Sequence, residues 1–257
     1  MMLRGLDIIA PRCLMSKAAL RVVKPKEMHG QRMVGLIGLR EDRNSSYRMG
    51  ASNAPKLIRQ HFLKPSVNSW CELGVDVHDK IVDYGDIQPK ERHHSDIYKA
   101  IEHDMDELQR IDGLIPLTLG GDHSITFSTC MAVRKFVGKP LVIVHFDAHP
   151  DIYENFEDNP SSHASPFARI CEVPGLCKKL IQIGIRTLSG EQMPQIGRYG
   201  VELIEAKNFP AKGSEIREIL QKFIPNGDVP VYISVDIDVL EPVKKYFLHL
   251  CASAIYF

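Results

Sequence analysis

The sequence lacks several features that would point to particular classes of protein. Its formal net charge is zero, with 32 basic against 32 acidic residues, so the charge balance does not indicate nucleic acid or an anionic membrane as a partner. No apolar run reaches the roughly 18 residues that a membrane-spanning helix needs. The six cysteines include no Cys-x-x-Cys pair, which favours reduced thiols over a disulfide framework.

The chain also has no internal repeat, no low-complexity segment and no linker rich in proline and glycine, so we expect one folded domain. Its first 28 residues form a distinct leader, with six basic side chains against two acidic ones. A basic, acid-poor and partly apolar leader resembles a mitochondrial transit peptide. The alternative is an ordinary solvated basic tail.

Strand and helix patterns alternate along the rest of the chain. Apolar, β-branched runs predict strands at 33–39, 81–83, 114–119, 141–146, 180–184, 201–204 and 231–235. Helices are predicted to begin near Ala54–Pro55, after Ser95 and after His123, and to cover 214–223. This alternation predicts an α/β fold with a parallel sheet and helices on both faces.

Three of the predicted strands run directly into residues that can bind metal ions. The strand at 141–146 is followed by Asp-Ala-His-Pro-Asp, the strand at 114–119 by Gly-Gly-Asp-His-Ser, and the strand at 231–235 by Asp-Ile-Asp. Ligands in an open α/β sheet bind just beyond the carboxyl ends of the strands. The three ends deliver six candidate ligands: His123, Asp147, His149, Asp151, Asp236 and Asp238.

Four carboxylates and two imidazoles are too many for one ion, and this mixture suits Mn²⁺ better than a metal that prefers thiolates. The alternative is that each aspartate only caps the helix that follows its strand. That alternative explains one strand end well but does not explain three together.

Taken in this order, the three motifs resemble the signature of the ureohydrolase family, which includes arginases and agmatinases. The likeness is greatest to plant-type arginases, whose loop is similar to residues 147–169 in length and in most identities. The resemblance covers roughly residues 33–242. It implies a three-layer αβα fold and divides the chain into the leader at 1–28, an incomplete ureohydrolase domain at 29–242 and a tail at 243–257.

The resemblance also implies two Mn²⁺ ions per subunit. One ion would be held by His123 and Asp151, and the other by His149 and Asp238. Asp147 and Asp236 would bridge both ions. Two further roles are implied. Asp151 would accept a hydrogen bond from a metal-bridging hydroxide, and His163 would carry protons to the leaving amine, for which an imidazole is suited.

Asn159 and Ser162 are candidates for contacting the α-carboxylate of the substrate. The implied reaction is hydrolysis of a guanidino group that converts L-arginine to L-ornithine and urea. Agmatine hydrolysis is the alternative reaction. The resemblance further implies a small-molecule guanidino substrate and assembly into trimers or hexamers. It implies a mitochondrial location, with the cytoplasm as the alternative.

The resemblance stops after Pro242. Family members continue with a final central strand and a glutamate that binds the substrate guanidinium, and residues 243–257 match neither. We therefore expect the final central strand to be missing and residues 1–257 alone to release little or no urea. An inactive form that binds metal or modulates family oligomers is then an alternative function. For the sheet, two arrangements stay open: an unpaired gap, or an antiparallel strand within 246–256 that folds back after Pro242.

Overall fold

The computed structural model describes the chain in separate stretches. These are residues 33–62, 64, 66–71, 73–77, 80–87, 99, 101, 103, 105, 114–211, 213–225, 229–240 and 251–256, with only the backbone at 209–211, 213–215 and 251–256. The predicted leader at 1–28 lies outside the described residues, as do residues 241–250 and 257 of the C-terminal region.

Strands and helices alternate through most of the described chain. In order they are β1 (Met33–Leu39), η2 (Ala51–Asn53), α1 (Ala54–Phe62), β2 (Ile81–Ile87), β3 (Leu114–Leu119), α3 (Ile125–Val137), β4 (Leu141–Phe146), α4 (Pro166–Glu172), β5 (Cys177–Ile185), α5 (Met193–Arg198), β6 (Glu202–Glu205), η4 (Ala206–Ala211), α6 (Gly213–Phe223), β7 (Val231–Asp236), η5 (Ile237–Val239) and β8 (Cys251–Tyr256).

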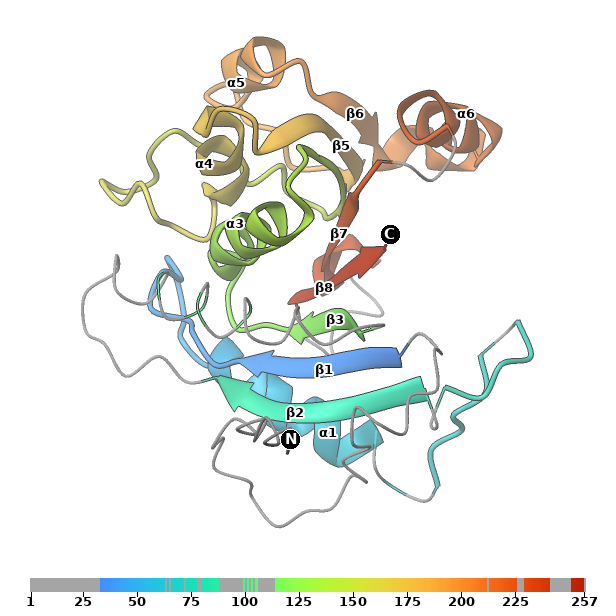
Figure 1. The fold of residues 1–257 in the computed structure, drawn as a ribbon. Coiled ribbons are helices and arrows are strands. Elements are labelled where there is room, and N and C mark those ends of the chain that lie inside the picture. The colour runs from blue at the N-terminus through green and yellow to red at the C-terminus, as the bar shows by residue number, and fades with distance from the viewer. Residues whose placement is uncertain are drawn as a thin grey trace, which may run out of the picture.

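Among the described residues, eight strands form one sheet in the order β2-β1-β3-β8-β7-β4-β5-β6. The pairings that do not involve β8 are all parallel. Figure 1 shows β1, β2 and β3 on one side of β8, with β7 on its other side leading toward β5 and β6. The α/β fold class with a parallel sheet is therefore confirmed.

The centre of the sheet differs from the rest. We expected the family's final parallel strand to be missing, and in the described part of the chain no parallel strand lies between β3 and β7. The position is nevertheless not empty. β8 fills the position and is antiparallel to both neighbours, with Ser253 opposite Thr118 on one side and opposite Ser234 on the other. Of the two arrangements that the sequence left open, the antiparallel strand is the one observed.

The direction of β8 changes how it is joined to β7. An antiparallel return needs no crossover helix, whereas parallel strands are usually joined by one. β7 ends at Asp236 and β8 begins at Cys251, and of the residues between them the structure describes only 237–240, which include the short 3-10 turn η5.

Helices cover both faces of the sheet, and the alternation of side chains along β4 shows how. Leu141 and Ile143 point to one face and pack in a cluster with residues of α3 and α4. Val142 and Val144 point to the other face and pack in a cluster with residues of α6. Figure 1 shows α3 and α4 apart from α6 in the same way. The three-layer arrangement follows from this two-sided burial.

Most predicted elements are confirmed, with shifted ends. β2 extends to Ile87, beyond the predicted 81–83, and β5 begins at Cys177 instead of 180. The short helices α4 and α5 were not predicted. Of the helix predicted after Ser95, the structure describes only residues 99, 101, 103 and 105, which are helical, and the remainder lies outside the described residues. None of the described helices has both the length and the apolar character needed to cross a bilayer.

The central place of β8 can be tested with proline. Ser253 lies opposite a residue of each neighbouring strand, so its backbone N–H is used within the sheet. Ser253→Pro removes that donor and leaves a buried acceptor unpaired, which should lower the free energy of unfolding by about 1–3 kcal/mol or more. Urea unfolding followed by circular dichroism measures this change. Ser253→Ala keeps the N–H and is the control; equal stability of the two variants would contradict the placement of β8.

Candidate metal centre

Three strand ends meet at one edge of the sheet. β3 leads through a Gly-Gly turn to His123 just before α3, β4 leads into residues 147–151, and β7 ends at Asp236. Since these strands are aligned in the same direction, their carboxyl ends share one edge, where open α/β sheets bind ligands. The six predicted ligands are brought together there.

The turn before His123 requires glycine because it approaches the loop after β1 closely. A Cβ on Gly121 would lie 1.7 Å from the carbonyl oxygen of Glu41. The Gly121 N–H donates to the carbonyl of Leu39, 3.0 Å away. This packing fixes the start of α3 and therefore the position of His123.

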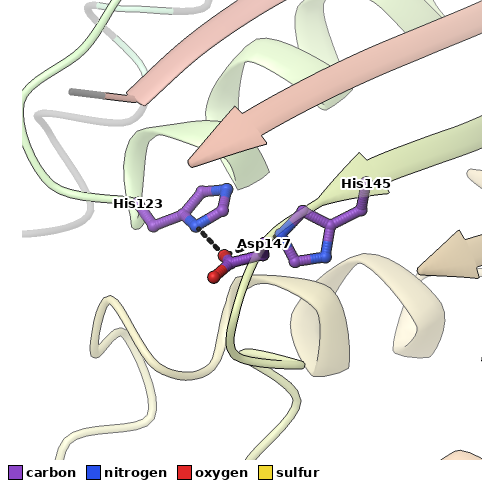
Figure 2. A group of neighbouring side chains, drawn as sticks. All are labelled: His123, His145 and Asp147. Atoms are coloured by element: carbon purple, nitrogen blue, oxygen red, sulfur yellow. Dashed lines mark hydrogen bonds and ion pairs between the residues drawn. The ribbon is translucent and has the colours of Figure 1, made fainter. Parts of the chain in front are cut away.

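His123 is the centre of the first half of the site. Its Nδ1 lies 2.9 Å from a carboxylate oxygen of Asp151, 3.2 Å from Oδ2 of Asp147 and 3.7 Å from Oδ2 of Asp236. Figure 2 shows the ring of His123 pointing toward the Asp147 carboxylate. The loop reaches this geometry partly through Asp151, whose backbone adopts a positive φ of 45°, uncommon for a residue other than glycine.

His149 is the centre of the second half. Its Nδ1 lies 3.0 Å from Oδ2 of Asp238 and 3.5 Å from Oδ1 of Asp147. Asp147 thus turns one carboxylate oxygen toward His123 and the other toward His149. Asp236 is tied to this half through its Oδ1, which accepts from the N–H of Asp238 at 3.0 Å. The arrangement has two halves that share one carboxylate.

The carboxylates are crowded in a buried place. Burial, together with the negative charge of Asp147, raises the pKa of Asp151 to about 7 and also raises the pKa of Asp236. Asp147 is fully buried as well, but hydrogen bonds from His123 and His145 hold its pKa well below its usual range. Burying several anions together is costly without compensating positive charge.

In the second half, with no ion bound, hydrogen bonds to Asp147 and Asp238 raise the pKa of His149 to about 10, which favours its protonated form. A metal ion would replace that proton, because a histidine ligand is neutral. Oxygen and imidazole donors gathered in this way fit a hard or borderline divalent cation. Two groups among the described residues place their donor atoms close enough to hold an ion: His123, His145 and Asp147, and Asp147, His149 and Asp238.

The structure adds residues that the motif analysis missed. His145 lies inside β4 and is fully buried; its Nε2 is 2.8 Å from Oδ2 of Asp147, and Gln182 donates to its Nδ1 at 3.1 Å. Ser234 on β7 pairs with Nε2 of His123 at 2.9 Å. A histidine inside an otherwise apolar strand, two residues before a ligand, was the available signal for His145. Ser234 had no comparable signal.

Three further candidates lie on the long loop after β4. His163 is half-buried; burial and the neighbouring His123 and His149 lower its pKa. Asn159 donates from Nδ2 to Oδ1 of Asn44 at 3.3 Å. Ser162 is buried, and its hydroxyl accepts from the N–H of Ala164 at 3.3 Å within its own turn. Substrate contacts by Asn159 and Ser162 stay predictions.

Comparison with known proteins gives a consistent result. The model of the arginase family matches residues 32–244. The mitochondrial arginase of Medicago truncatula is 39% identical over 219 residues, covering 80% of this chain and 62% of that protein. The solved structure of arginase from the same plant has a TM-score of 0.76 and 36% identity, covering 85% of this chain and 70% of that one.

Two other solved structures are similar. Formimidoylglutamase from Bacillus subtilis has a TM-score of 0.72 and 31% identity, with 90% of this chain and 75% of that chain covered. A putative agmatinase from Clostridium difficile has a TM-score of 0.70 and 25% identity, with 83% and 74% covered. The chain spans about 60% of the length of the curated plant relatives that it matches.

Phe167 of α4 packs against two histidines of the site, and its substitution tests how much this packing stabilises the protein. The ring is fully buried, with its centroid 4.0 Å from that of His145 and 5.4 Å from that of His123. Phe167→Ala leaves a cavity and should lower the free energy of unfolding by about 3–5 kcal/mol. Chemical denaturation measures this value. Leu73→Ala, at a side chain that is 89% exposed, should change it by no more than about 0.5 kcal/mol; similar effects of the two variants would contradict the packing.

Proposed function

Because this chain belongs to the arginase family, we propose that it is a ureohydrolase that uses two Mn²⁺ ions to hydrolyse L-arginine to L-ornithine and urea. The observation that carries the proposal is the position of Asp147, whose two carboxylate oxygens face different imidazoles. A carboxylate shared in this way suits a pair of ions better than a single one.

Each ion would have its own imidazole. In the first half, His123 and Asp151 would hold one ion, and in the second half His149 and Asp238 would hold the other. Asp147 would bridge the two ions. Asp236 would be the second bridging ligand, since it lies near His123 and is hydrogen bonded to the backbone of Asp238. This assignment uses all six ligands that the sequence predicts.

Guanidinium is a poor electrophile, so its hydrolysis requires a strong nucleophile near neutral pH. When bound, the two divalent cations would supply the Lewis acidity that lowers the pKa of water. Asp151, a buried carboxylate next to His123, would accept a hydrogen bond from the attacking water. His163 would carry a proton to the leaving amine, because an imidazole can take up a proton and then donate it. Burial lowers the pKa of His163, which favours the neutral ring that takes up the proton first.

The substrate contacts would come from the loop after β4. We assign Asn159 and Ser162 to the α-carboxylate of arginine. Agmatine lacks this carboxylate and is the alternative substrate, which the similarity to a putative agmatinase supports. The comparison of the two substrates therefore tests the role of this loop directly.

The location, substrate class and assembly of this protein are proposed from its membership of the arginase family. A mitochondrial location fits the name of the Medicago relative and the basic leader at 1–28, with the cytoplasm as the alternative. The substrate would be a small guanidino compound. A homotrimer or hexamer would be the assembly if this chain follows its relatives.

The ligand assignment predicts metal contents that differ between variants. Asp147→Ala or Asp236→Ala should abolish tight binding of both ions, because each removes a shared ligand. His123→Ala should weaken mainly one ion. Elemental analysis of manganese in gel-filtered protein measures this, with Asp158→Asn, an exposed loop aspartate, as the control that retains the metal content of the parent. Equal metal content in all variants would rule the two-ion assignment out.

Urea release tests the reaction. The assay compares arginine and agmatine, with Mn²⁺, for residues 1–257 and for a chimera that carries the corresponding Medicago arginase segment in place of 243–257. We expect the chimera to prefer arginine, and the chain alone to be slower by roughly a thousandfold, as the loss of several kcal/mol of transition-state binding would produce.

The outcomes separate the ideas. Faster turnover of agmatine would favour the alternative substrate. A rate for residues 1–257 within tenfold of the chimera would show that the expectation about the tail is wrong. Absence of urea from both proteins, with manganese bound, would contradict the proposed function.

A further inference from the structure

The loop that follows β1 is held rigidly against the candidate site. Asp42, which is buried, closes this β1 loop (residues 40–50) on itself, since its Oδ2 accepts from the backbone N–H of Gly50 at 2.6 Å and of Ser52 at 3.0 Å. The N–H of Ser45 donates to the carbonyl of Asp42 at 3.2 Å. These bonds limit the conformations that the segment between them can adopt.

Asn44 connects this loop to two other segments. It is buried, and its N–H donates to Oδ2 of Asp122 at 3.0 Å while its Nδ2 donates to the hydroxyl of Ser124 at 3.1 Å. Asp122 and Ser124 flank His123 in sequence, so these two bonds tie the β1 loop to the start of α3. On its other side, the carbonyl of Asn44 accepts from the N–H of His163 at 3.1 Å, and its Oδ1 accepts from Asn159.

Two residues beyond Asn44, the hydroxyl of Ser46 meets the ring of His163. The Ser46 Oγ and His163 Nε2 are 2.8 Å apart, a good hydrogen-bond distance. The main chains on both sides are already fixed, since Asn44 binds the backbone of His163 and Asp42 closes the loop. The same loop therefore holds both the backbone of His163, through Asn44, and its ring, through the Ser46 hydroxyl.

We propose that Ser46 is the positioning residue for His163, and that the β1 loop, anchored by Asn44, orients the imidazole for proton transfer. The catalytic consequence rests on the proposed function, while the positioning itself does not. Ser46 acts through the ring: its bond occupies Nε2 and leaves Nδ1 as the nitrogen available for other partners. A histidine held in this way loses little further conformational freedom when it transfers a proton.

The neighbouring serine provides a matched control. The hydroxyl of Ser45 is directed to Oδ2 of Asp122, 3.3 Å away, and not to His163. Asp122 keeps its bond from the N–H of Asn44 when the Ser45 hydroxyl is removed, so the β1 loop stays anchored. Ser45→Ala and Ser46→Ala thus delete the same group from adjacent residues with different expected effects.

The experiment observes the His163 ring by NMR in the full chain, with ¹⁵N shifts for the two ring nitrogens and ¹³C relaxation for ring mobility. The signals are assigned from their loss in His163→Asn. At a pH where the ring is neutral, we expect Ser46→Ala to move the Nε2 resonance toward that of a solvent-exposed histidine and to increase ring mobility. Ser46→Thr, which keeps the hydroxyl, and Ser45→Ala should both resemble the parent.

Steady-state urea release by the same substitutions, made in the chimera that carries the Medicago arginase segment in place of 243–257, gives the catalytic readout. Ser46→Ala should lower kcat roughly threefold to tenfold, the equivalent of about one hydrogen bond, with KM unchanged, and Ser46→Thr should restore it. Unchanged His163 signals in Ser46→Ala would overturn the proposal. Changed signals with an unchanged kcat would overturn its catalytic part. If the unsubstituted chimera releases no urea with manganese bound, the proposed function fails and the ring signals alone decide whether Ser46 positions His163.

Discussion

The candidate centre depends on the buried carboxylate of Asp147. Its Oδ2 lies within reach of His123 and His145, and its Oδ1 lies near the ring of His149 and accepts from the His149 N–H at 2.8 Å. A buried anion is costly unless it is paired and hydrogen bonded. These partners offset that cost, and in doing so they set the relative positions of both halves of the site.

The hydrogen bonds that support Asp147 continue into strands β4 and β5 of the sheet. His145 lies two residues before Asp147 and pairs with its carboxylate, and the His145 ring is held in turn by Gln182 of the neighbouring strand β5. Gln182 also donates to the carbonyl of Pro150 at 2.6 Å, which fixes the segment carrying His149 and Asp151. The ligands and their supporting residues therefore form one hydrogen-bonded unit built on four parallel strands, β3, β4, β5 and β7, and their loops.

β8 contributes none of the six predicted ligands, but it sets the distance between two strands that do. His123 follows β3, whereas Asp236 follows β7, and the two strands are separated by β8. Neighbouring strands lie about 4.8 Å apart in both parallel and antiparallel sheets, so an antiparallel strand keeps β3 and β7 at the same separation. Its direction does change what reaches the site edge: Cys251, the first residue of β8, lies opposite Asp236.

Much of this centre could be predicted because the relevant signals are local. Asp147, His149 and Asp151 stand within five residues of a clear apolar strand, and parallel strands bring their carboxyl ends to one edge whatever the details of packing. The ends of β2 and β5 were less accurate, since the pairing of a strand with its neighbours decides where it stops.

Other features were decided only in the folded chain. Nothing near Ser46 in the sequence indicates that its hydroxyl meets His163, because the two residues are 117 positions apart and are joined through Asn44. Whether the C-terminal residues form a strand at all was likewise left open, with an unpaired gap as the alternative to an antiparallel strand. The sequence by itself determined which residues could bind metal and that their strands would be parallel. Tertiary structure decided which histidine supports the shared carboxylate and whether the central position of the sheet is filled, because each depends on contacts between distant segments.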